Sequence, residues 1–391
     1  MTRVTVHEYA AALRPRYRAA QRRKEKQRIL DEFCRTTGLH RKAAIRLLNQ
    51  EGQPRAFPRG RPRQYGPEVL EPLHQVWEVG DRMCGKLLKA AMPDLICALE
   101  RHRELKLTPE CRELLLHMSA STIDRLLKRR ARRLSDLLPK HKTPADQSLK
   151  AEVPVRTWSE WQDVKPGELQ ADLVLHCGES TEGFYLTTLS TVDVATGWSE
   201  HQAIWGHGQQ RVGTGMHHIH SRLPFALRRL HTDNGSEFIN RGLIDWCKRH
   251  DVSFSRGRPY KKNDQAWVEQ RNWQSVRRSI GYGRYSSKPA YELLLKLYPL
   301  LDLQMNFFRP LRKLVAKKRE GAKLSKLYDE PRTPYQRLLA SGALTVTDKA
   351  RMNKLLEGLN PAELQRRIDH LLRKLWELAD RTEGGSLANV G

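Results

Sequence analysis

The chain has 391 residues and carries 70 Lys and Arg against 44 Asp and Glu, a formal net charge of +26 at pH 7. A basic excess of this size favours a polyanionic partner, and nucleic acid is the leading candidate. The sequence has no apolar run near the roughly 20 residues that cross a bilayer, and no signal-peptide core at its N-terminus. We therefore expect a cytoplasmic protein with no membrane partner.

The cysteine and histidine patterns argue against a zinc module. Six cysteines are scattered along the chain without a C-x-x-C pair, which predicts reduced thiols. His217, His218 and His220 have no cysteine partners, and we interpret them as part of a solvated or DNA-facing helix.

The first fifty residues are predicted to be helical, and residues 20–50 have the pattern of a helix-turn-helix. Apolar residues repeat at helical spacing on both sides of a turn that contains Gly38, and the second helix is basic. In this motif the second helix enters the major groove, so Arg41, Lys42 and Arg46 are candidate DNA contacts. An ordinary helical hairpin is the alternative.

Residues 54–68 are rich in Pro, Gly and Arg and are expected not to fold alone. The core RGRPR resembles an AT-hook, with Arg59, Arg61 and Arg63 suited to the narrow minor groove of A·T-rich DNA. A basic linker with no groove preference is the alternative.

Residues 67–138 are predicted to form a second helical unit. Its last helix begins near Ser119 or Ser121 and ends in a strongly basic run. This helix could complete a second helix-turn-helix, whose outward residues would be Thr122, Asp124, Arg125 and Lys128, with Arg125 and Lys128 as DNA contacts.

From about residue 155 the pattern becomes α/β. Residues 168–176 alternate as a strand, two further strands flank a turn at 195–197, and shorter strands are expected at 225–230 and 252–255. Three helices are expected in this region, at residues 207–222, 237–249 and 261–282. Ser236 is expected to cap the second of them. The order βββαβαβα predicts a mixed five-stranded sheet.

Three acids in this region are predicted to point inward. Asp172 lies on the first strand, opposite the face of Leu169 and Leu173, and Asp233 follows a strand immediately before an Asn-Gly turn. Glu269 lies within an apolar helical stripe that includes Trp273. A buried carboxylate is costly unless it binds a cation or a hydrogen-bond donor, so these acids are candidate ligands.

Thirty-five residues separate Asp233 from Glu269. With Asp172 on an earlier strand and the stretch HTDNGSEF at 231–238, this spacing resembles the D,D-35-E signature of the retroviral-integrase-like transposase superfamily. The stretch KNDQAWVEQRN at 262–272 resembles the third motif of bacterial insertion-sequence transposases.

The resemblance covers residues 155–285 and extends more loosely to the N-terminal helices and to the basic tail NFFRPLRKLVAKKR. Retroviral integrases carry an N-terminal His/Cys zinc module that this sequence cannot form. The resemblance is therefore to the transposases of the superfamily.

The resemblance implies an RNase H-like fold in which Asp172, Asp233 and Glu269 are the catalytic, metal-binding residues. It implies two divalent ions, normally Mg²⁺ with Mn²⁺ as a possible substitute, which activate the attacking oxygen and stabilise the leaving 3′ oxygen. The implied partners are double-stranded DNA at the element ends and in the target, and the implied location is the nucleoid of a bacterial cytoplasm. The late helix adds Lys261, Lys262, Arg271 and Arg278 as candidate DNA contacts.

Four other residues near the carboxylates have simpler interpretations. Asp193 is expected to serve the turn after its strand, Glu237 and Asp264 to begin helices, and His176 either to support Asp172 or to pack at a strand end.

The expected fold is multidomain, with N-terminal all-α helix-turn-helix modules, a central RNase H-like domain and a basic, mostly α-helical C-terminal region. The expected boundaries are 1–53, 54–66, 67–138, 139–154, 155–300 and 301–391. Joining two DNA ends requires at least a homodimer on DNA. A leucine-rich stripe over 364–378 is a candidate interface, and packing against the preceding helix in the same chain is the alternative.

Two other functions are consistent with the sequence. One is a structure-selective nuclease of the same fold, which cuts without joining. The other is a DNA-binding regulator with a vestigial core, against which the three intact acids argue.

Overall fold

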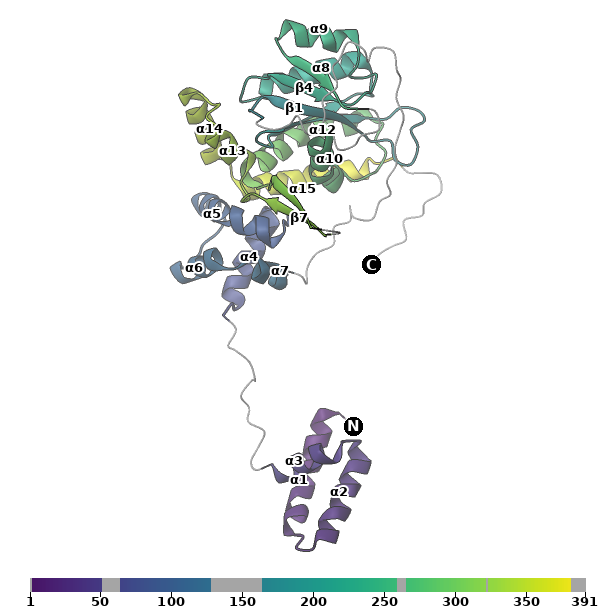
Figure 1. Cartoon of the computed structure of the whole chain (residues 1–391), viewed down its shortest axis with the longest axis vertical. Helices are drawn as coiled ribbons and strands as arrows, with labels where there is room; N and C mark the ends of the chain where they lie inside the picture. The colour runs from purple at the N-terminus through teal and green to yellow at the C-terminus, as the bar shows by residue number, and fades with distance from the viewer. Residues whose placement is uncertain (1, 51–63, 128–163, 259–264, 321–322, 381–391) are drawn as a thin grey trace. The chain divides into compact units, whose positions relative to one another are not determined.

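The computed structural model describes residues 2–50, 64–127, 164–258, 265–320 and 323–380 (Figure 1). The chain forms two compact units, Met1–Gln64 and Tyr65–Gly391. The second unit holds both the predicted second helical segment and the α/β region, so the expected boundaries inside it stay predictions.

The first unit consists of three helices, α1 (Arg3–Ala19), α2 (Arg23–Thr37) and α3 (Arg41–Asn49). They enclose a small core that includes Phe33 and Leu48, both fully buried. Gly38 ends α2 with φ 69°, a left-handed conformation that favours glycine. The helices and the glycine turn of the predicted helix-turn-helix are thus confirmed, and its binding to DNA stays a prediction.

The second unit begins with four helices, α4 (Pro67–Val79), α5 (Gly85–Arg101), α6 (Pro109–His117) and α7 (Ala120–Leu127). Ser119 caps α7 by accepting a hydrogen bond from the Thr122 N–H at 3.1 Å, as expected. Asp124 faces inward instead of outward, because its carboxylate accepts the Gly85 N–H at the start of α5 at 2.7 Å.

The centre of the unit is a five-stranded mixed sheet in the order β3-β2-β1-β4-β5. β1 pairs antiparallel with β2 and parallel with β4, while β2–β3 is antiparallel and β4–β5 is parallel. This is the connectivity of an RNase H-like fold, and it confirms the predicted sheet. The strands are β1 (Glu168–Leu175), β2 (Thr187–Asp193), β3 (Ser199–Ile204), β4 (Arg229–Thr232) and β5 (Ser253–Arg256).

Helices cover both faces of the sheet. α10 and α12 pack on the face that carries Asp172, while α8 packs on the other face, where Gly215 approaches Leu189 and Ile204. α9 packs against α8 and β5. The helices are α8 (Gln209–Arg222), α9 (Arg241–Arg249), α10 (Ala266–Asn272) and α12 (Lys288–Leu303).

Two predicted helices differ from the observed ones. α9 begins at Arg241 and is capped by Asn240, whose side chain accepts the Leu243 N–H at 2.9 Å, so Ser236 is not its cap. After α10, the expected long helix changes to a π-helix, η4 (Trp273–Arg277), and ends with α11 (Arg278–Ile280).

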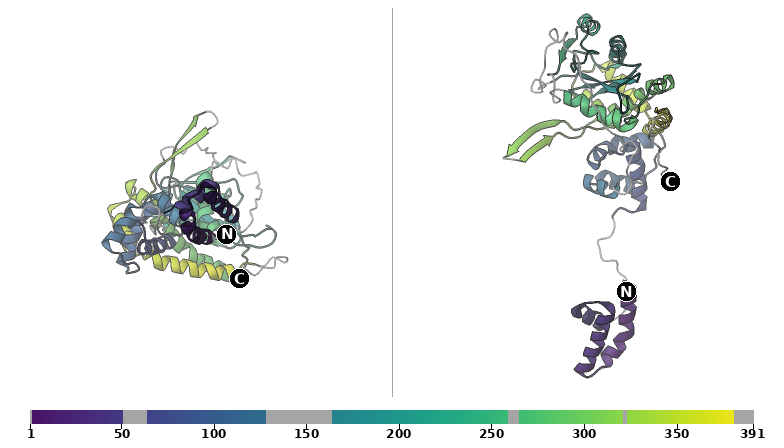
Figure 2. Two further views of the ribbon diagram at one scale, coloured as in Figure 1. Left: turned by 90° about the horizontal axis from the view of Figure 1, so that it is seen from below. Right: turned by 90° about the vertical axis from the view of Figure 1, so that its right-hand side faces the viewer.

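The C-terminal region contains a β-hairpin that the sequence analysis did not predict. A second π-helix, η5 (Gln304–Phe308), leads into β6 (Leu314–Glu320), which pairs antiparallel with β7 (Lys323–Tyr328) (Figure 2). The region is otherwise helical, as predicted, with α13 (Pro334–Ala340), α14 (Val346–Gly358) and α15 (Pro361–Glu377).

The apolar stripe of α15 is buried within the same chain. Leu364, Ile368, Leu372 and Leu375 have at most 6% of their surface exposed and belong to the main core. α15 packs mainly against α12, with smaller contacts to α4 and α5. The hypothesis that this stripe is a dimer interface is therefore wrong. Of the helices described in the structure, none has the length and apolarity of a membrane span.

Candidate active site

Two of the predicted acids lie on neighbouring parallel strands, Asp172 within β1 and Asp233 directly after β4. β1 and β4 are paired in register, with Leu169 opposite Leu230. Asp172 lies on β1 just beyond the paired segment, and Asp233 directly follows β4. Because β1 and β4 are parallel and Gln170 lies opposite His231, Asp172 and Asp233 are level with each other on adjacent strands.

The Asp172 carboxylate is held in place and surrounded by like charges. Its Oδ2 accepts a hydrogen bond from Asn272 Nδ2 on α10 at 2.7 Å, and its Oδ1 accepts the Leu173 N–H at 2.9 Å. Burial raises the pKa of Asp172 well above its ordinary value, and the negative charges of Asp233, Glu269 and Glu237 raise it further. The structure thus brings the three predicted acids into one electrostatic cluster.

The turn after Asp233 aims its carboxylate. Asp233 Oδ1 accepts the Gly235 N–H at 3.0 Å, and Asn234 Nδ2 donates to the Gly257 carbonyl at 2.8 Å. Arg256 donates to Asn234 Oδ1 at 2.8 Å, which ties the turn to β5. Neither Asn234 nor Gly235 has a positive φ. Side-chain hydrogen bonds therefore stabilise this turn.

Glu269 lies on α10, but not in an apolar stripe. Glu269 is exposed and Trp273 is 51% exposed, whereas the inward face of the helix carries Val268, Asn272 and Val276. The argument from the cost of burying Glu269 is therefore wrong. Its charge nevertheless acts on Asp172.

Glu237 is a fourth carboxylate that the sequence analysis assigned only to a helix start. Glu237 is half-buried, and burial followed by the charge of Asp233 raises its pKa. A Cβ atom on Gly235 would lie 2.5 Å from the Glu237 carboxyl, so the glycine leaves room for that side chain to fold back. No periodicity in the sequence indicates this contact.

The donor set of the cluster suits a hard divalent cation. Among the described residues, no group of three or more His, Cys, Asp or Glu is arranged so that it could hold a metal ion. Carboxylate oxygens are nevertheless the ligands that Mg²⁺ and Mn²⁺ prefer. The mutual repulsion that raises the pKa of Asp172 is also the repulsion that a bound cation would relieve. We conclude that the residues fit such an ion.

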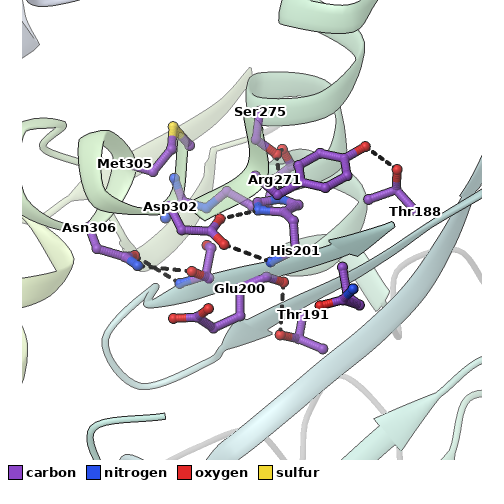
Figure 3. Close-up of polar contacts among 12 residues, drawn as sticks. Thr188, Thr191, Glu200, His201, Arg271, Ser275, Asp302, Met305 and Asn306 are labelled. Atoms are coloured by element: carbon purple, nitrogen blue, oxygen red, sulfur yellow. Dashed lines mark hydrogen bonds and ion pairs between the residues drawn. The ribbon is translucent and has the colours of Figure 1, made fainter. Parts of the chain in front are cut away.

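A buried polar network holds the helix that carries Glu269 and Asn272 (Figure 3). His201 on β3 contacts Ser275 of η4 at 2.8 Å through Nε2, and its Nδ1 is paired with Asp302 at the end of α12. Ser275 also donates to the Arg271 carbonyl at 2.8 Å, across the transition from α10 to η4. The network therefore joins the π-helix to the sheet and to α12, with all its side chains buried.

The end of α12 and the π-helix η5 cover the free edge of β3. Asn306 accepts the Ser199 N–H and donates to the Ser199 carbonyl, each at 2.9 Å, and Asp302 accepts the His201 N–H at 3.0 Å. These contacts satisfy backbone groups that an edge strand otherwise leaves unpaired.

Asp193 and His176 are structural residues. Asp193 is fully buried and accepts hydrogen bonds from the Gly167 N–H, the Thr196 N–H and the Thr196 hydroxyl, which confirms its predicted turn role. His176 is packed at the strand end, where Nε2 lies 2.7 Å from the Thr188 hydroxyl. Burial lowers its pKa to about 3.

The predicted DNA contacts differ in their surroundings. Arg41, Lys42, Arg46 and Arg125 are exposed. Arg271 is 4% exposed and donates to the Gly197 carbonyl, so its predicted role in DNA binding is wrong. Arg278 is half-buried and donates to the Asp81 carbonyl at 2.8 Å. The remaining candidates lie outside the described residues, and they are Arg59, Arg61, Arg63, Lys128, Lys261 and Lys262. Asp264 lies outside the described residues too.

Comparison with known proteins defines the class of this core. Residues 164–262 match the family model rve, described as integrase core domain. A crystal structure of the catalytic core domain of BIV integrase matches 49% of this chain and 99% of that chain, at 20% identity and a TM-score of 0.30. The sheet order and the family model define an integrase-like core with an RNase H-like fold, the core of a polynucleotidyl transferase or nuclease.

The chain is also similar along most of its length to a bacterial protein. The uncharacterized protein y4rM of Sinorhizobium fredii (strain NBRC 101917 / NGR234) is 40% identical over 330 residues, which are 84% of this chain and 94% of that protein. The chain belongs to the same family as that protein.

Proposed function

We propose that this protein is a DNA transposase that cleaves DNA at the ends of a mobile element and joins the freed 3′ ends to target DNA. The observation that carries the proposal is the carboxylate cluster on an integrase core, in which Asp233 and Glu269 both act on the pKa of Asp172. Carboxylates from two adjacent strands and a covering helix suit the transfer of a phosphodiester between oxygens.

In this proposal the divalent ions are held by Asp172, Asp233 and Glu269. The ions are Mg²⁺, and Mn²⁺ can substitute for Mg²⁺. When bound, the ions would supply charge stabilisation for the attacking and leaving oxygens of the displacement. Asn272 orients Asp172, and the hydrogen-bonded turn after Asp233 fixes the second carboxylate. The reaction needs no covalent link between protein and DNA, so no Ser, Tyr or Cys nucleophile is assigned.

End recognition belongs, in this proposal, to the helical parts that precede the sheet. The exposed basic face of α3 would enter the major groove, and the RGRPR segment would follow the minor groove. A complex that joins two ends needs two active sites, so we expect at least a dimer on DNA.

The test is a joining assay on the element's own DNA. Inverted repeats flanking the gene would supply the substrate, pre-cut to expose a 3′-OH and mixed with a supercoiled target and Mg²⁺. We expect covalently joined products. Cleavage without joining under all conditions would instead indicate the nuclease alternative, and specific binding without either reaction would indicate a DNA-binding regulator.

A further inference from the structure

A groove runs along α10, the helix that carries Glu269. It has a volume of about 510 Å³, within the range of roughly 300–1,000 Å³ that is common for ligand sites. One wall is the start of α5, the opposite wall is the base of the β6–β7 hairpin, and the floor is α10 with η4. These segments are far apart in the sequence.

The lining of this groove, which we call the α10 groove, is basic and aromatic. Among the described residues that line it there is no Asp or Glu. Lys313 Nζ donates to the Ala195 carbonyl at 2.8 Å and Arg312 Nε to the Asp329 carbonyl at 3.2 Å, contacts that do not neutralise their charges. The basic lining residues that are at least partly exposed are Lys86, Arg278, Arg312 and Lys313, and the large aromatic residues are Trp267, Trp273 and Tyr328. Arg271 and Arg309 also line the groove but are buried, and Arg309 is paired with Asp81.

Trp273 lies at the junction of α10 and η4, four residues after Glu269. Helical backbone angles continue through this junction, with φ −66° and ψ −43° at Trp273, and the turn that begins there is a π turn. Four residues are close to one turn of either an α-helix or a π-helix, so Glu269 and Trp273 lie on the same side of this segment. Trp273 is 51% exposed, so its ring is open to a ligand that also reaches Glu269.

We propose that the α10 groove binds an unpaired segment of the DNA strand next to the scissile phosphate, with one base stacked on Trp273. This inference rests on the proposed function and adds a subsite to it. An exposed indole beside several cations is the combination that binds single-stranded nucleic acid, in which the bases stack on aromatic rings and the phosphates meet positive charge. The absence of acids among the described lining residues fits a polyanion rather than a basic protein segment.

The first experiment measures binding of a short, fluorescein-labelled oligothymidylate to the full-length protein. It uses roughly 0.2 M salt, where contacts to the backbone alone are weakened. Trp273→Ala should weaken binding about 5- to 150-fold, since stacking contributes that much per base, and Trp273→Phe should keep most of the affinity. Trp376→Ala is the matched control, because Trp376 is 39% exposed on α15, outside the groove.

The second experiment locates the base. An oligonucleotide with 5-iodouracil is crosslinked to the full-length protein by ultraviolet light, and the product is digested with trypsin. Cleavage after Arg271 and Arg277 isolates Trp273 in a peptide separate from Trp267. We expect the crosslink on peptide 272–277, and its loss in Trp273→Ala.

Three outcomes would overturn the proposal. They are wild-type affinity of Trp273→Ala, equal loss in Trp273→Ala and Trp376→Ala, and crosslinks only outside the groove. If any of these outcomes occurs while joining activity is normal, the subsite is rejected and the proposed transposase function is kept. Absent joining activity with a crosslink on Trp273 would reject the function and keep a single-strand binding groove.

Discussion

Asn272 determines how Asp172 is presented. Its amide nitrogen donates to the carboxylate at 2.7 Å from a buried position on α10, so the side chain can neither rotate away nor be replaced by water. An amide orients the carboxylate without neutralising it, which leaves the charge available to a cation. This is the arrangement expected of a residue that positions a metal ligand.

Replacing Asn272 by Leu should therefore weaken divalent binding. The expected effect is about a 10- to 100-fold higher Mg²⁺ concentration for half-maximal activity, typical for loss of such a support. The measurement is a Mg²⁺ titration of cleavage, in which excess Mg²⁺ should restore most of the wild-type rate. A lower rate that no Mg²⁺ concentration restores would contradict the positioning role.

A second prediction at the residue scale concerns the structural role of Asp193. Asp193→Ala removes the acceptor of three hydrogen bonds in a buried turn and leaves their donors unpaired. The free energy of unfolding should fall by at least about 1–3 kcal/mol. Urea unfolding measures this, with exposed Asp245→Ala as a control that should change it by less than about 0.5 kcal/mol. Equal effects of the two substitutions would contradict the turn role.

At the scale of elements, the π-helix η4 is the feature that most affects the site. A π turn inserted after Asn272 changes the phase of the following side chains, and Ser275 then faces His201. The Ser275–His201–Asp302 network connects this irregular turn to β3 and α12. It therefore fixes the orientation of the helix that presents Glu269.

Removing the middle member of the network should destabilise the fold. His201→Ala leaves the Asp302 carboxylate buried without its imidazole partner, and such losses cost about 3–5 kcal/mol. Chemical denaturation measures the loss, and exposed His217→Ala on α8 is the matched control. A change below about 1 kcal/mol for His201→Ala would contradict the structural importance of the network.

The order of strands and helices along the chain and the acids on β1 and after β4 were predictable because each depends on local signals. The alternation in β1 and the turn after Asp233 are visible in the sequence, and the spacing to Glu269 matches a known pattern. The π-helix, the contact of Glu237 with the cluster and the burial of Arg271 were not predictable, because each depends on tertiary packing. Arg271 in particular is indistinguishable in sequence from an exposed helical arginine.

At the scale of the whole molecule, the second unit has one continuous core from α4 to α15. Ion pairing supports it, since buried Arg309 contacts Asp81 in the α4–α5 loop at 2.5 Å. A fragment limited to residues 150–300 would lack both α15 and the α4–α7 helices. Substitutions in the full chain are therefore the better probes of this unit.

The α15 stripe should stabilise the monomer. Leu372→Ala removes a buried side chain and should lower the free energy of unfolding by about 2–5 kcal/mol. Leu355→Ala is the control, because Leu355 is 41% exposed on α14. Without DNA, the unfolding midpoint should not depend on protein concentration. A midpoint that rises with concentration in the wild type, and no longer does in Leu372→Ala, would restore the interface hypothesis.

The first unit should contribute the salt-sensitive part of DNA binding. Alanine at Arg41, Lys42 and Arg46 should weaken binding to the element end and lower the salt slope by roughly one for each lost phosphate contact. Arg373→Ala, an exposed arginine of α15, is the control. An unchanged affinity and slope would remove α3 from the DNA-binding surface.

The central claim is that Asp172, Asp233 and Glu269 together perform DNA cleavage and joining, and their conservative replacement tests it most directly. Asp172→Asn, Asp233→Asn and Glu269→Gln each remove one charge at nearly constant size, and exposed Asp245→Asn is the matched control. Joined products are measured on pre-cut element ends with Mg²⁺, and binding to the same ends is measured in parallel. The account predicts that each of the three substitutions abolishes joining with end binding nearly intact, while Asp245→Asn stays active. Substantial Mg²⁺-dependent joining by any one of the three would contradict the account.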